Sequence, residues 1–165
     1  MSLFSKRRRA PEPAGSAGEA YHRWYYDARV WRGVSWLGVP CLKSVADMWN
    51  YQEIIWELRP SVVIEFGTCH GGSALYFANL LAQLGGRRRV LTVDITHELV
   101  APALLRHPGI DFVLSSSTAA GIPARIEALR RDYPGPAFAI LDGDHSMAHV
   151  LSEMELLRPL LTAGD

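Results

Sequence analysis

The segment "SVVIEFGTCHGGSALYFANLL", residues 61–81, decides the fold of this chain. It begins with a short run rich in β-branched residues, which predicts a buried strand, and the run leads to an acid, Glu65. A turn that contains Gly67, Gly71 and Gly72 follows, and an apolar helical pattern then extends over about residues 72–84. A strand, a glycine turn and a helix in this order form the first part of a βαβ unit.

The same alternation continues along the rest of the sequence. The runs "RVLTVDI", "IDFVLSSS" and "AFAILDG" predict three more strands. The helical patterns "ELVAPALLRH", "ARIEALRRDY" and "HSMAHVLSEMELLRPLL" follow them in turn. Short apolar strands that alternate with helices favour a parallel sheet covered on both faces. Because crossovers between parallel strands are right-handed, the predicted fold class is α/β, a doubly wound and mostly parallel, Rossmann-like sheet with helices on both faces.

Three segments are expected. Residues 1–18 hold a basic cluster followed by Pro, Gly, Ser and Ala, which predicts a disordered basic arm. Residues 19–59 form an aromatic-rich, helical N-terminal segment, with a helix that starts at an N-cap, Ser44, and stops at Pro60. Residues 60–165 contain the α/β pattern. Most of the aromatic rings between residues 19 and 40 are expected to pack in the core, and the alternative is the wall of a substrate pocket.

The composition excludes several classes of protein. The 165 residues include 17 Lys and Arg against 17 Asp and Glu, so the formal net charge is zero and no nucleic-acid partner is expected. No apolar run reaches the roughly 18 residues that span a bilayer, so no membrane span is expected. The two cysteines, Cys41 and Cys69, fit neither a metal motif nor a disulfide framework, which favours a reducing cytoplasm.

The glycine turn limits the choice of ligand. In a dinucleotide fingerprint the second glycine allows close approach of a pyrophosphate, and Cys69 occupies that position here, which disfavours a nucleotide-dependent oxidoreductase. The Walker pattern fails too, because no Lys-Ser or Lys-Thr pair follows the glycines. An acid before the turn suits a ligand with a positive amino group. The candidate binding residues in this segment are Glu65, Gly67, Thr68, Gly71, Gly72 and Ser73.

The next two strands add polar groups at the same edge of the sheet. Asp94 ends the second strand, where an acid accepts hydrogen bonds from ribose hydroxyls. Ser117 follows the third strand, where a short hydroxyl can meet the edge of an adenine. Together these elements predict an S-adenosylmethionine site. The alternatives are that Glu65 and Asp94 cap helices or pair with arginines, and that Ser117 caps a helix.

At this point the sequence resembles a known family. The blocks "YQEIIWELRPSVVIEFGTCHGGSALYFANLL", "VLTVDI", "HPGIDFVLSSST" and "ILDGDHSMAHVLSEMELLRPLLTAGD" are similar to the cephalosporin hydroxylase and rhamnosyl O-methyltransferase family. The resemblance implies the class I methyltransferase fold, with S-adenosylmethionine as cofactor and sugar hydroxyls or related natural-product alcohols as acceptors. It also implies that residues 60–165 are a partial methyltransferase domain, since the family's later strands are missing and the C-terminus looks truncated.

The same resemblance assigns roles to an acidic segment, "LDGDHSMAH". In the metal-dependent O-methyltransferases that this chain resembles, an acid at the end of the fourth strand is the first metal ligand, and Asp142 matches it. A carboxylate suits Mg²⁺, which lowers the pKa of the acceptor hydroxyl. A basic side chain three residues later is the candidate general base in these relatives, and His145 holds that position. A helix-capping role for His145 is the alternative.

The sequence therefore predicts an S-adenosylmethionine-dependent, divalent-metal-assisted O-methyltransferase whose catalytic residues are His145 and Asp142. A non-catalytic protein with the same fold, or an inactive fragment, is the alternative. The open edge of the fourth strand would also permit a homo-oligomer.

Overall fold

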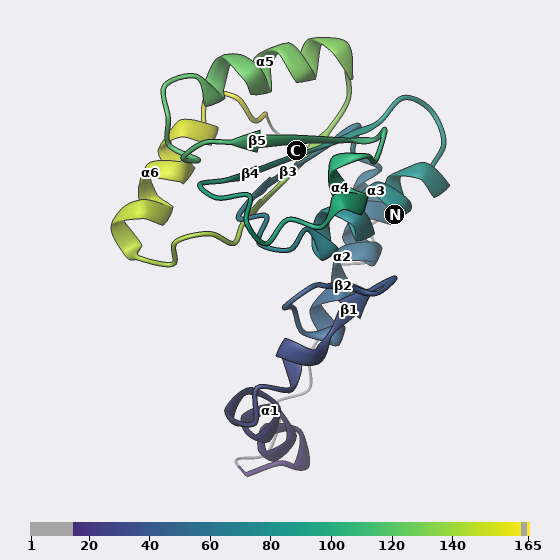
Figure 1. Cartoon of the computed structure of the whole chain (residues 1–165), viewed down its shortest axis with the longest axis vertical. Coiled ribbons are helices and arrows are strands. Elements are labelled where there is room, and N and C mark those ends of the chain that lie inside the picture. Colours follow the sequence, from purple (N-terminus) through teal and green to yellow (C-terminus); the bar gives the residue numbers. More distant parts are fainter. Residues whose placement is uncertain (1–14, 163–164) are drawn as a thin grey trace.

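The computed structural model describes residues 15–162 and Asp165 (Figure 1). The basic cluster of the predicted arm lies outside the described residues. The helices are α1 (Ala17–Asp27), the 3₁₀ helix η2 (Val30–Gly33), α2 (Val45–Leu58), α3 (Gly72–Gln83), α4 (Pro102–Leu105), α5 (Ile122–Asp132) and α6 (Met147–Leu157). The strands are β1 (Ser35–Trp36), β2 (Val39–Pro40), β3 (Val62–Phe66), β4 (Arg89–Asp94), β5 (Ile110–Leu114) and β6 (Ala137–Leu141).

Within the described residues, β3 to β6 form one parallel sheet in the order β5-β4-β3-β6. The predicted parallel α/β fold is therefore confirmed. From β3 the chain crosses first toward β4 and β5, and it then returns to the other side of β3 as β6. The order thus reverses at β3, and ligands in open α/β sheets bind at the carboxyl ends of the strands beside such a reversal.

Two apolar layers hold the helices on the sheet. Val63 of β3 packs in one layer with Ile55 of α2 and Phe77 of α3. Its neighbour Ile64 packs in the other layer with Ile126 of α5. Because successive strand side chains point to opposite faces, the continuous apolar run of β3 serves both layers, and the whole strand is buried. Figure 1 shows α5 and α6 away from α2 and α3, across the sheet.

The helix predicted after residue 44 is confirmed as α2. Its N-cap is Ser44, whose side-chain oxygen accepts a hydrogen bond from the backbone nitrogen of Ala46 at 3.2 Å. Arg59 adopts a left-handed conformation with φ 51°, and Pro60 follows it, so the helix ends where the sequence predicts. Met48 and Ile55 on its predicted apolar face are buried.

The helix predicted over "ELVAPALLRH" is much shorter than expected. Only Pro102–Leu105 is helical, as α4. The proline explains the difference, because a proline disfavours helical backbone in the residue before it and is tolerated in the first helical turn. Ala101 accordingly has an extended backbone with ψ 137°.

The expectation that most N-terminal aromatics pack in the core is wrong. On α1, Tyr25 is buried, but Tyr21 and Trp24 are 61% and 55% exposed. Figure 1 shows the reason, since α1 lies at the far end of the molecule from the sheet. The helix also begins at Ala17, so the last residues of the predicted arm are helical.

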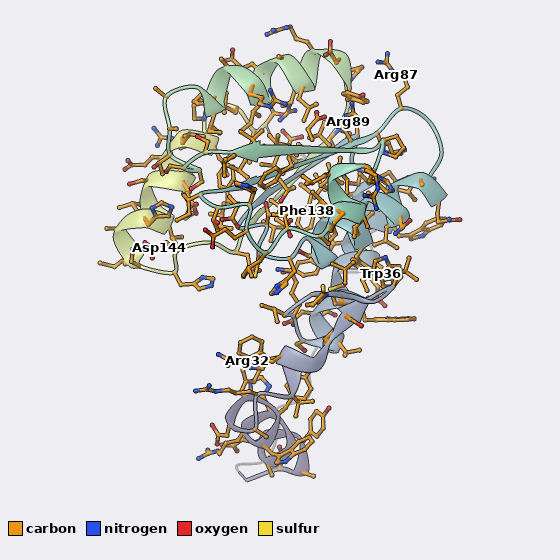
Figure 2. All side chains as sticks on the ribbon, viewed as in Figure 1. Arg32, Trp36, Arg87, Arg89, Phe138 and Asp144 are labelled. Carbon is orange, nitrogen blue, oxygen red and sulfur yellow. The ribbon has the colours of Figure 1, made fainter. Side chains whose placement is uncertain are left out.

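The short β1–β2 hairpin joins this outlying helix to the α/β domain. Trp36 lies where the hairpin meets the domain (Figure 2), and its ring contacts that of Tyr76 on α3 edge-on, with 4.9 Å between the centroids. An edge-to-face pair of this kind stabilises packing. Trp36 therefore anchors the hairpin.

Candidate functional site

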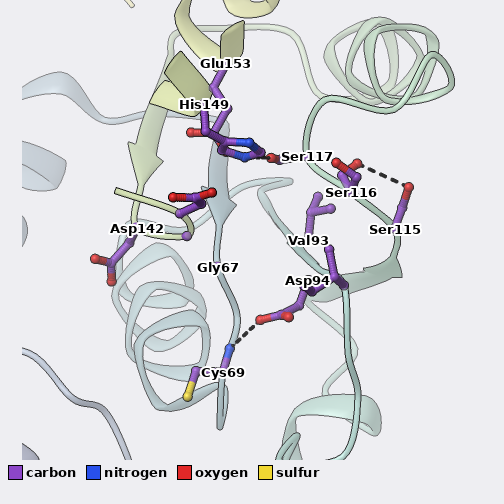
Figure 3. Close-up of a pocket in the computed structure, with 13 residues that line it drawn as sticks. Gly67, Cys69, Val93, Asp94, Ser115, Ser116, Ser117, Asp142, His149 and Glu153 are labelled. Atoms are coloured by element: carbon purple, nitrogen blue, oxygen red, sulfur yellow. Dashed lines mark hydrogen bonds and ion pairs between the residues drawn. The ribbon is translucent and has the colours of Figure 1, made fainter. Parts of the chain in front are cut away.

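A cavity of about 450 Å³ lies at the carboxyl ends of the parallel strands (Figure 3). This is the volume and the place expected of a cofactor site in a doubly wound sheet. Its walls come from the ends of β3, β4, β5 and β6 and from the first turns of α6. The lining residues are Gly67, Cys69, Val93, Asp94, Ile95, Ser115, Ser116, Ser117, Asp142, Gly143, Asp144, His149 and Glu153.

Two glycines of the turn are needed for close contacts between backbones. Gly67 has φ 100°, and a Cβ atom there would lie 2.3 Å from the carbonyl oxygen of Asp142. At Gly72 a Cβ atom would lie 2.4 Å from the carbonyl oxygen of Pro40. Contacts this short cannot be accommodated without moving backbone. Gly67 therefore sets the approach of β3 to β6, and Gly72 sets the approach of the hairpin to α3.

Asp94 holds the glycine turn by its side chain. Its Oδ2 atom accepts hydrogen bonds from the backbone nitrogens of Thr68 at 2.9 Å and Cys69 at 2.8 Å. Its Oδ1 atom accepts from the backbone nitrogen of Thr96 at 3.1 Å. These bonds fix Cys69 in a left-handed conformation, φ 48°, which a glycine would adopt more easily. Each carboxylate oxygen has two lone pairs, so Oδ1 can accept one more hydrogen bond, such as that of a ribose hydroxyl.

Glu65 lies beneath the turn and not in the cavity wall. The side chain is fully buried, with Oε1 accepting from the Ser73 hydroxyl at 2.5 Å and Oε2 accepting from the Thr92 hydroxyl at 2.8 Å. Burial raises the pKa of Glu65 to about 7, although Lys43 and the two hydroxyls act in the opposite direction. Within the described residues, Glu65 and Asp94 form no ion pair with an arginine. The predicted contact of Glu65 with a ligand stays a prediction.

A second, smaller cavity of about 220 Å³ adjoins the first and shares Gly67, Cys69 and Asp142 with it. Besides Gly67 and Asp142, four more predicted site residues line it: Thr68, Gly72, Ser73 and His145. The hairpin side of its wall includes Trp31 and Cys41. Gly71 is buried at the start of α3 and belongs to neither wall. Apart from Glu65 and Gly71, every predicted site residue thus lines one or both of two adjoining cavities at the switch point.

Asp142 interacts with a lysine that sequence reasoning missed. The ammonium of Lys43 is paired with the Asp142 carboxylate and lies 6.0 Å from the centre of the Tyr51 ring. Burial acts to lower the pKa of Lys43, but the carboxylates of Glu65 and Asp142 outweigh it and raise the pKa. The Nε2 atom of the exposed His145 lies 3.8 Å from Asp142 Oδ1. Figure 3 shows the Asp142 side chain pointing away from Asp94, and Asp142 also lines the second cavity.

The metal ligand set is not assembled in the described residues. Across residues 15–162 and Asp165, no group of three or more His, Cys, Asp or Glu side chains could hold a metal ion. Asp142 supplies one carboxylate, and its nearest positive charge is the Lys43 ammonium. Mg²⁺ prefers several oxygen ligands, so these residues do not by themselves make its site.

Ser117 is held by two residues of α6. Its hydroxyl donates a hydrogen bond to Glu153 Oε1 at 2.5 Å, and His149 Nε2 lies 3.0 Å from the same hydroxyl oxygen. Glu153 was missed because its carboxylate lies on the buried face of α6, beside Leu157. His149 and Glu153 are four residues apart on a predicted helix, so the sequence could have indicated that Glu153 lies on the same face as His149.

The fold and this cavity define a protein with the class I methyltransferase fold. The chain matches a solved structure described as "cmcI-N160 SAH" with a TM-score of 0.66 and 20% identity, over 100% of this chain and 78% of that chain. It matches another, described as "cmcI-D160 Mg-SAM", with a TM-score of 0.62 and 18% identity, over 98% of this chain and 66% of that chain.

The sequence comparison identifies the family. The model of the family described as Rhamnosyl O-methyltransferase/CmcI matches residues 28–165, and the chain belongs to this family. A curated relative from Mycobacterium tuberculosis, named Rhamnosyl O-methyltransferase, is 56% identical over 153 residues. The match covers 93% of this chain and 62% of that protein, so the chain spans about three-fifths of its relative's length.

Proposed function

We propose that the intact protein is an S-adenosylmethionine-dependent O-methyltransferase that acts on a sugar hydroxyl or a related natural-product alcohol. The observation that carries this proposal is the cavity at the switch point, where Asp94 both orders the glycine turn and faces the ligand space. The family and the name of the 56% identical relative support the reaction and the sugar acceptor.

The chemistry of the cavity wall fits this cofactor. The lining is acidic, with Asp94, Asp144 and Glu153, which suits a ligand that carries a sulfonium and an ammonium. Asp94 has an acceptor left for a ribose hydroxyl, and Ser117 offers a hydroxyl one strand further along the sheet. A phosphate ligand would be repelled by the same carboxylates. The wall therefore favours S-adenosylmethionine over a dinucleotide.

The protein's own residues would position the acceptor and its proton. When it is bound, S-adenosylmethionine supplies an electrophilic methyl group. His145 lines the second cavity next to Asp142, so a hydroxyl placed there can pass its proton to the imidazole as its oxygen takes the methyl group. Asp142 would orient His145, and Lys43 holds Asp142 in place.

Magnesium assistance is a separate part of the proposal. One structural neighbour is described with Mg and SAM together. In this chain Asp142 would be the first ligand, but the described residues do not complete a magnesium site. The proton transfer from the acceptor to His145 does not depend on the ion.

The acceptor would enter from the side of the hairpin. A third cavity, of about 270 Å³, has Asp142 and His145 in its wall together with three aromatic rings, those of Tyr26, Trp31 and Tyr51. Aromatic faces pack well on the apolar faces of sugar rings. Trp36, which the sequence also suggested for such a wall, packs on Tyr76 instead.

A non-catalytic binding protein is the second candidate. The Lys43 ammonium at Asp142 favours it, because a protein cation already neutralises the carboxylate predicted to hold the metal ion. Such a protein would bind the cofactor without turnover. The other expectations also remain proposals: a cytoplasmic location, in keeping with two free cysteines, and self-association. No helix in the described part of the chain is long and apolar enough to cross a membrane.

The test is methyl transfer from radiolabelled S-adenosylmethionine to methyl α-L-rhamnopyranoside, with and without Mg²⁺. Labelled methyl ether and an equal amount of S-adenosylhomocysteine are expected. His145→Ala should lower the rate by roughly a hundredfold or more, the usual size of a general-base effect. Cofactor binding without transfer to any sugar would support the binding protein instead.

A further inference from the structure

Three side chains form a cluster at the β5 side of the larger cavity: Ser117, His149 and Glu153 (Figure 3). Ser117 Oγ lies 2.5 Å from Glu153 Oε1, and His149 Nε2 lies 3.0 Å from Ser117 Oγ and 3.1 Å from the same Glu153 oxygen. Glu153 is 1% exposed, and its Oε2 atom has no hydrogen-bond partner in the described part of the chain.

This arrangement is costly for stability. A buried carboxylate with one unpartnered oxygen loses hydration that the protein does not replace. Polar groups left in this state need an explanation, and they concentrate at functional sites. The cluster lines the cavity, so a role in binding accounts for a glutamate on the buried face of α6.

The cluster is not a nucleophilic triad. In a triad the acid and the serine contact opposite nitrogens of the histidine, so that the ring can take the serine proton while the acid stabilises it. Here the same atom, His149 Nε2, faces both Ser117 and Glu153. The Ser117 proton also points directly to the carboxylate.

The direction of that hydrogen bond determines what Ser117 can offer to a ligand. A hydroxyl has one proton and two lone pairs. Because the proton is donated to Glu153, the oxygen of Ser117 can only accept further hydrogen bonds. The Ser117 side of the cavity therefore presents an acceptor and suits a ligand group that donates.

The order of the strands indicates which part of the ligand this is. Along the sheet the cavity wall runs from Gly67 after β3, to Asp94 at the end of β4, to Ser117 after β5. Asp94 and Leu114, the last residue of β5, are partners in the ladder. If Asp94 accepts from the ribose, Ser117 lies on the side of the ribose remote from the glycine turn, where the base would sit.

We infer that Glu153 is a positioning residue that fixes Ser117 as a hydrogen-bond acceptor and so selects the exocyclic amino group of adenine. This rests on the proposed function, since it takes S-adenosylmethionine as the ligand. A base with a carbonyl oxygen at that position would set an acceptor against an acceptor. His149 supports the geometry by contacting both partners.

The experiment compares S-adenosylhomocysteine with S-inosylhomocysteine, in which a carbonyl oxygen replaces the amino group. Calorimetry on this chain should give a preference for the adenosyl compound of roughly tenfold or more, the usual effect of an unmatched buried polar group. Glu153→Gln should reduce that preference by about tenfold, because the amide can donate to Ser117 and free its proton for a carbonyl ligand. Glu155→Gln, on the exposed side of α6, is the matched control and should leave the preference unchanged.

The outcomes distinguish failure of the inference about Glu153 from failure of the proposed function. If Glu153→Gln weakens both ligands equally, the residue has a structural role only and the inference is wrong. Ser117→Ala is the second variant: it removes the acceptor, and a preserved preference would likewise overturn the inference. If the folded wild-type chain binds the two compounds equally, only the inference fails. If neither this chain nor the intact protein binds either compound, the proposed function fails.

Discussion

The Asp94 carboxylate lies against the glycine turn, with its Oδ2 atom 2.8 Å from the backbone nitrogen of Cys69. The acid at the end of β4 therefore shapes the loop that follows β3. The conformation of the turn after β3 therefore depends on a side chain of the neighbouring strand β4, that of Asp94. The ribose contact proposed for Asp94 would thus be coupled to the conformation of the turn.

The buried Glu65 should make stability depend on pH. Its folded-state pKa of about 7 lies above the ordinary value of 4.5, so the folded state keeps its proton longer than the unfolded chain does. The contribution of Glu65 is therefore most favourable below pH 4.5, and stability is lost as the pH rises toward 7, by about 3 kcal/mol at most.

Urea denaturation of the wild type and of Glu65→Gln at pH 5 and pH 8 measures this effect. We expect the stability of the variant, relative to that of the wild type, to increase by roughly 1–3 kcal/mol between these pH values. Glu57→Gln, on the exposed surface of α2, should show no such change. A pH-independent difference for Glu65→Gln would contradict the raised pKa.

The close approach of β3 and β6 should make Gly67 intolerant of any side chain. A Cβ atom there would meet the Asp142 carbonyl oxygen at 2.3 Å, and the φ of 100° is unfavourable for alanine. Gly67→Ala should cost roughly 2–4 kcal/mol of unfolding free energy, the range for combined overpacking and backbone strain. At Gly121 nothing lies within 4 Å of a Cβ atom, so Gly121→Ala should be close to neutral. Equal effects in denaturant melts would show that the contact is misplaced.

The ion pair of Lys43 and Asp142 should be energetically coupled. Lys43 is buried while Asp142 is 40% exposed, so solvent screens the pair only in part. A double-mutant cycle with Lys43→Met and Asp142→Asn should give a coupling of about 1–2 kcal/mol.

The exposed pair of Arg23 and Glu19 on α1 provides the comparison, and its coupling should stay below about 0.5 kcal/mol. If the two cycles give the same small value, Lys43 does not hold Asp142 in place.

Trp31 should act on the acceptor more than on the cofactor. Trp31 lines the cavities of about 220 and 270 Å³ on the hairpin side. Among the described residues that line the 450 Å³ cavity, where the cofactor is proposed to bind, Trp31 is absent. Trp31→Ala should raise the acceptor KM by roughly tenfold, as loss of a buried aromatic contact does, with little change in cofactor Kd. Trp56→Ala, an exposed ring on α2, is the control. Equal changes in KM and Kd for Trp31→Ala would indicate a general effect on folding.

Local sequence patterns predicted the framework of the site because its elements are contiguous. The run before Glu65, the glycines after it and the acid at Asp94 all lie within single strand–turn–helix units. One wrong prediction, the length of α4, has a local cause in Pro102, and the other concerns position relative to distant elements. The density of aromatic rings in residues 19–40 favours burial, but it does not show that α1 stands away from the sheet (Figure 1).

The sequence alone also does not show which residues that are distant along the chain are in contact. Lys43 and Asp142 are 99 residues apart, and a lysine after a hairpin gives no local sign of its partner. Ser117 and Glu153 are 36 residues apart. The sequence placed Glu65 correctly at the end of a strand, but only the arrangement of Ser73 and Thr92 around it shows that both carboxylate oxygens are occupied.

Calorimetric titration of S-adenosylhomocysteine into this chain tests the central claim, the cofactor site at the switch point, most directly. We expect binding by the wild type, and a loss of roughly tenfold or more in Asp94→Asn, because its amide presents a donor where the ribose and the turn need an acceptor. Asp132→Asn, at the exposed end of α5, should bind like the wild type. No binding by a chain that unfolds cooperatively, or unchanged affinity in Asp94→Asn, would contradict the claim.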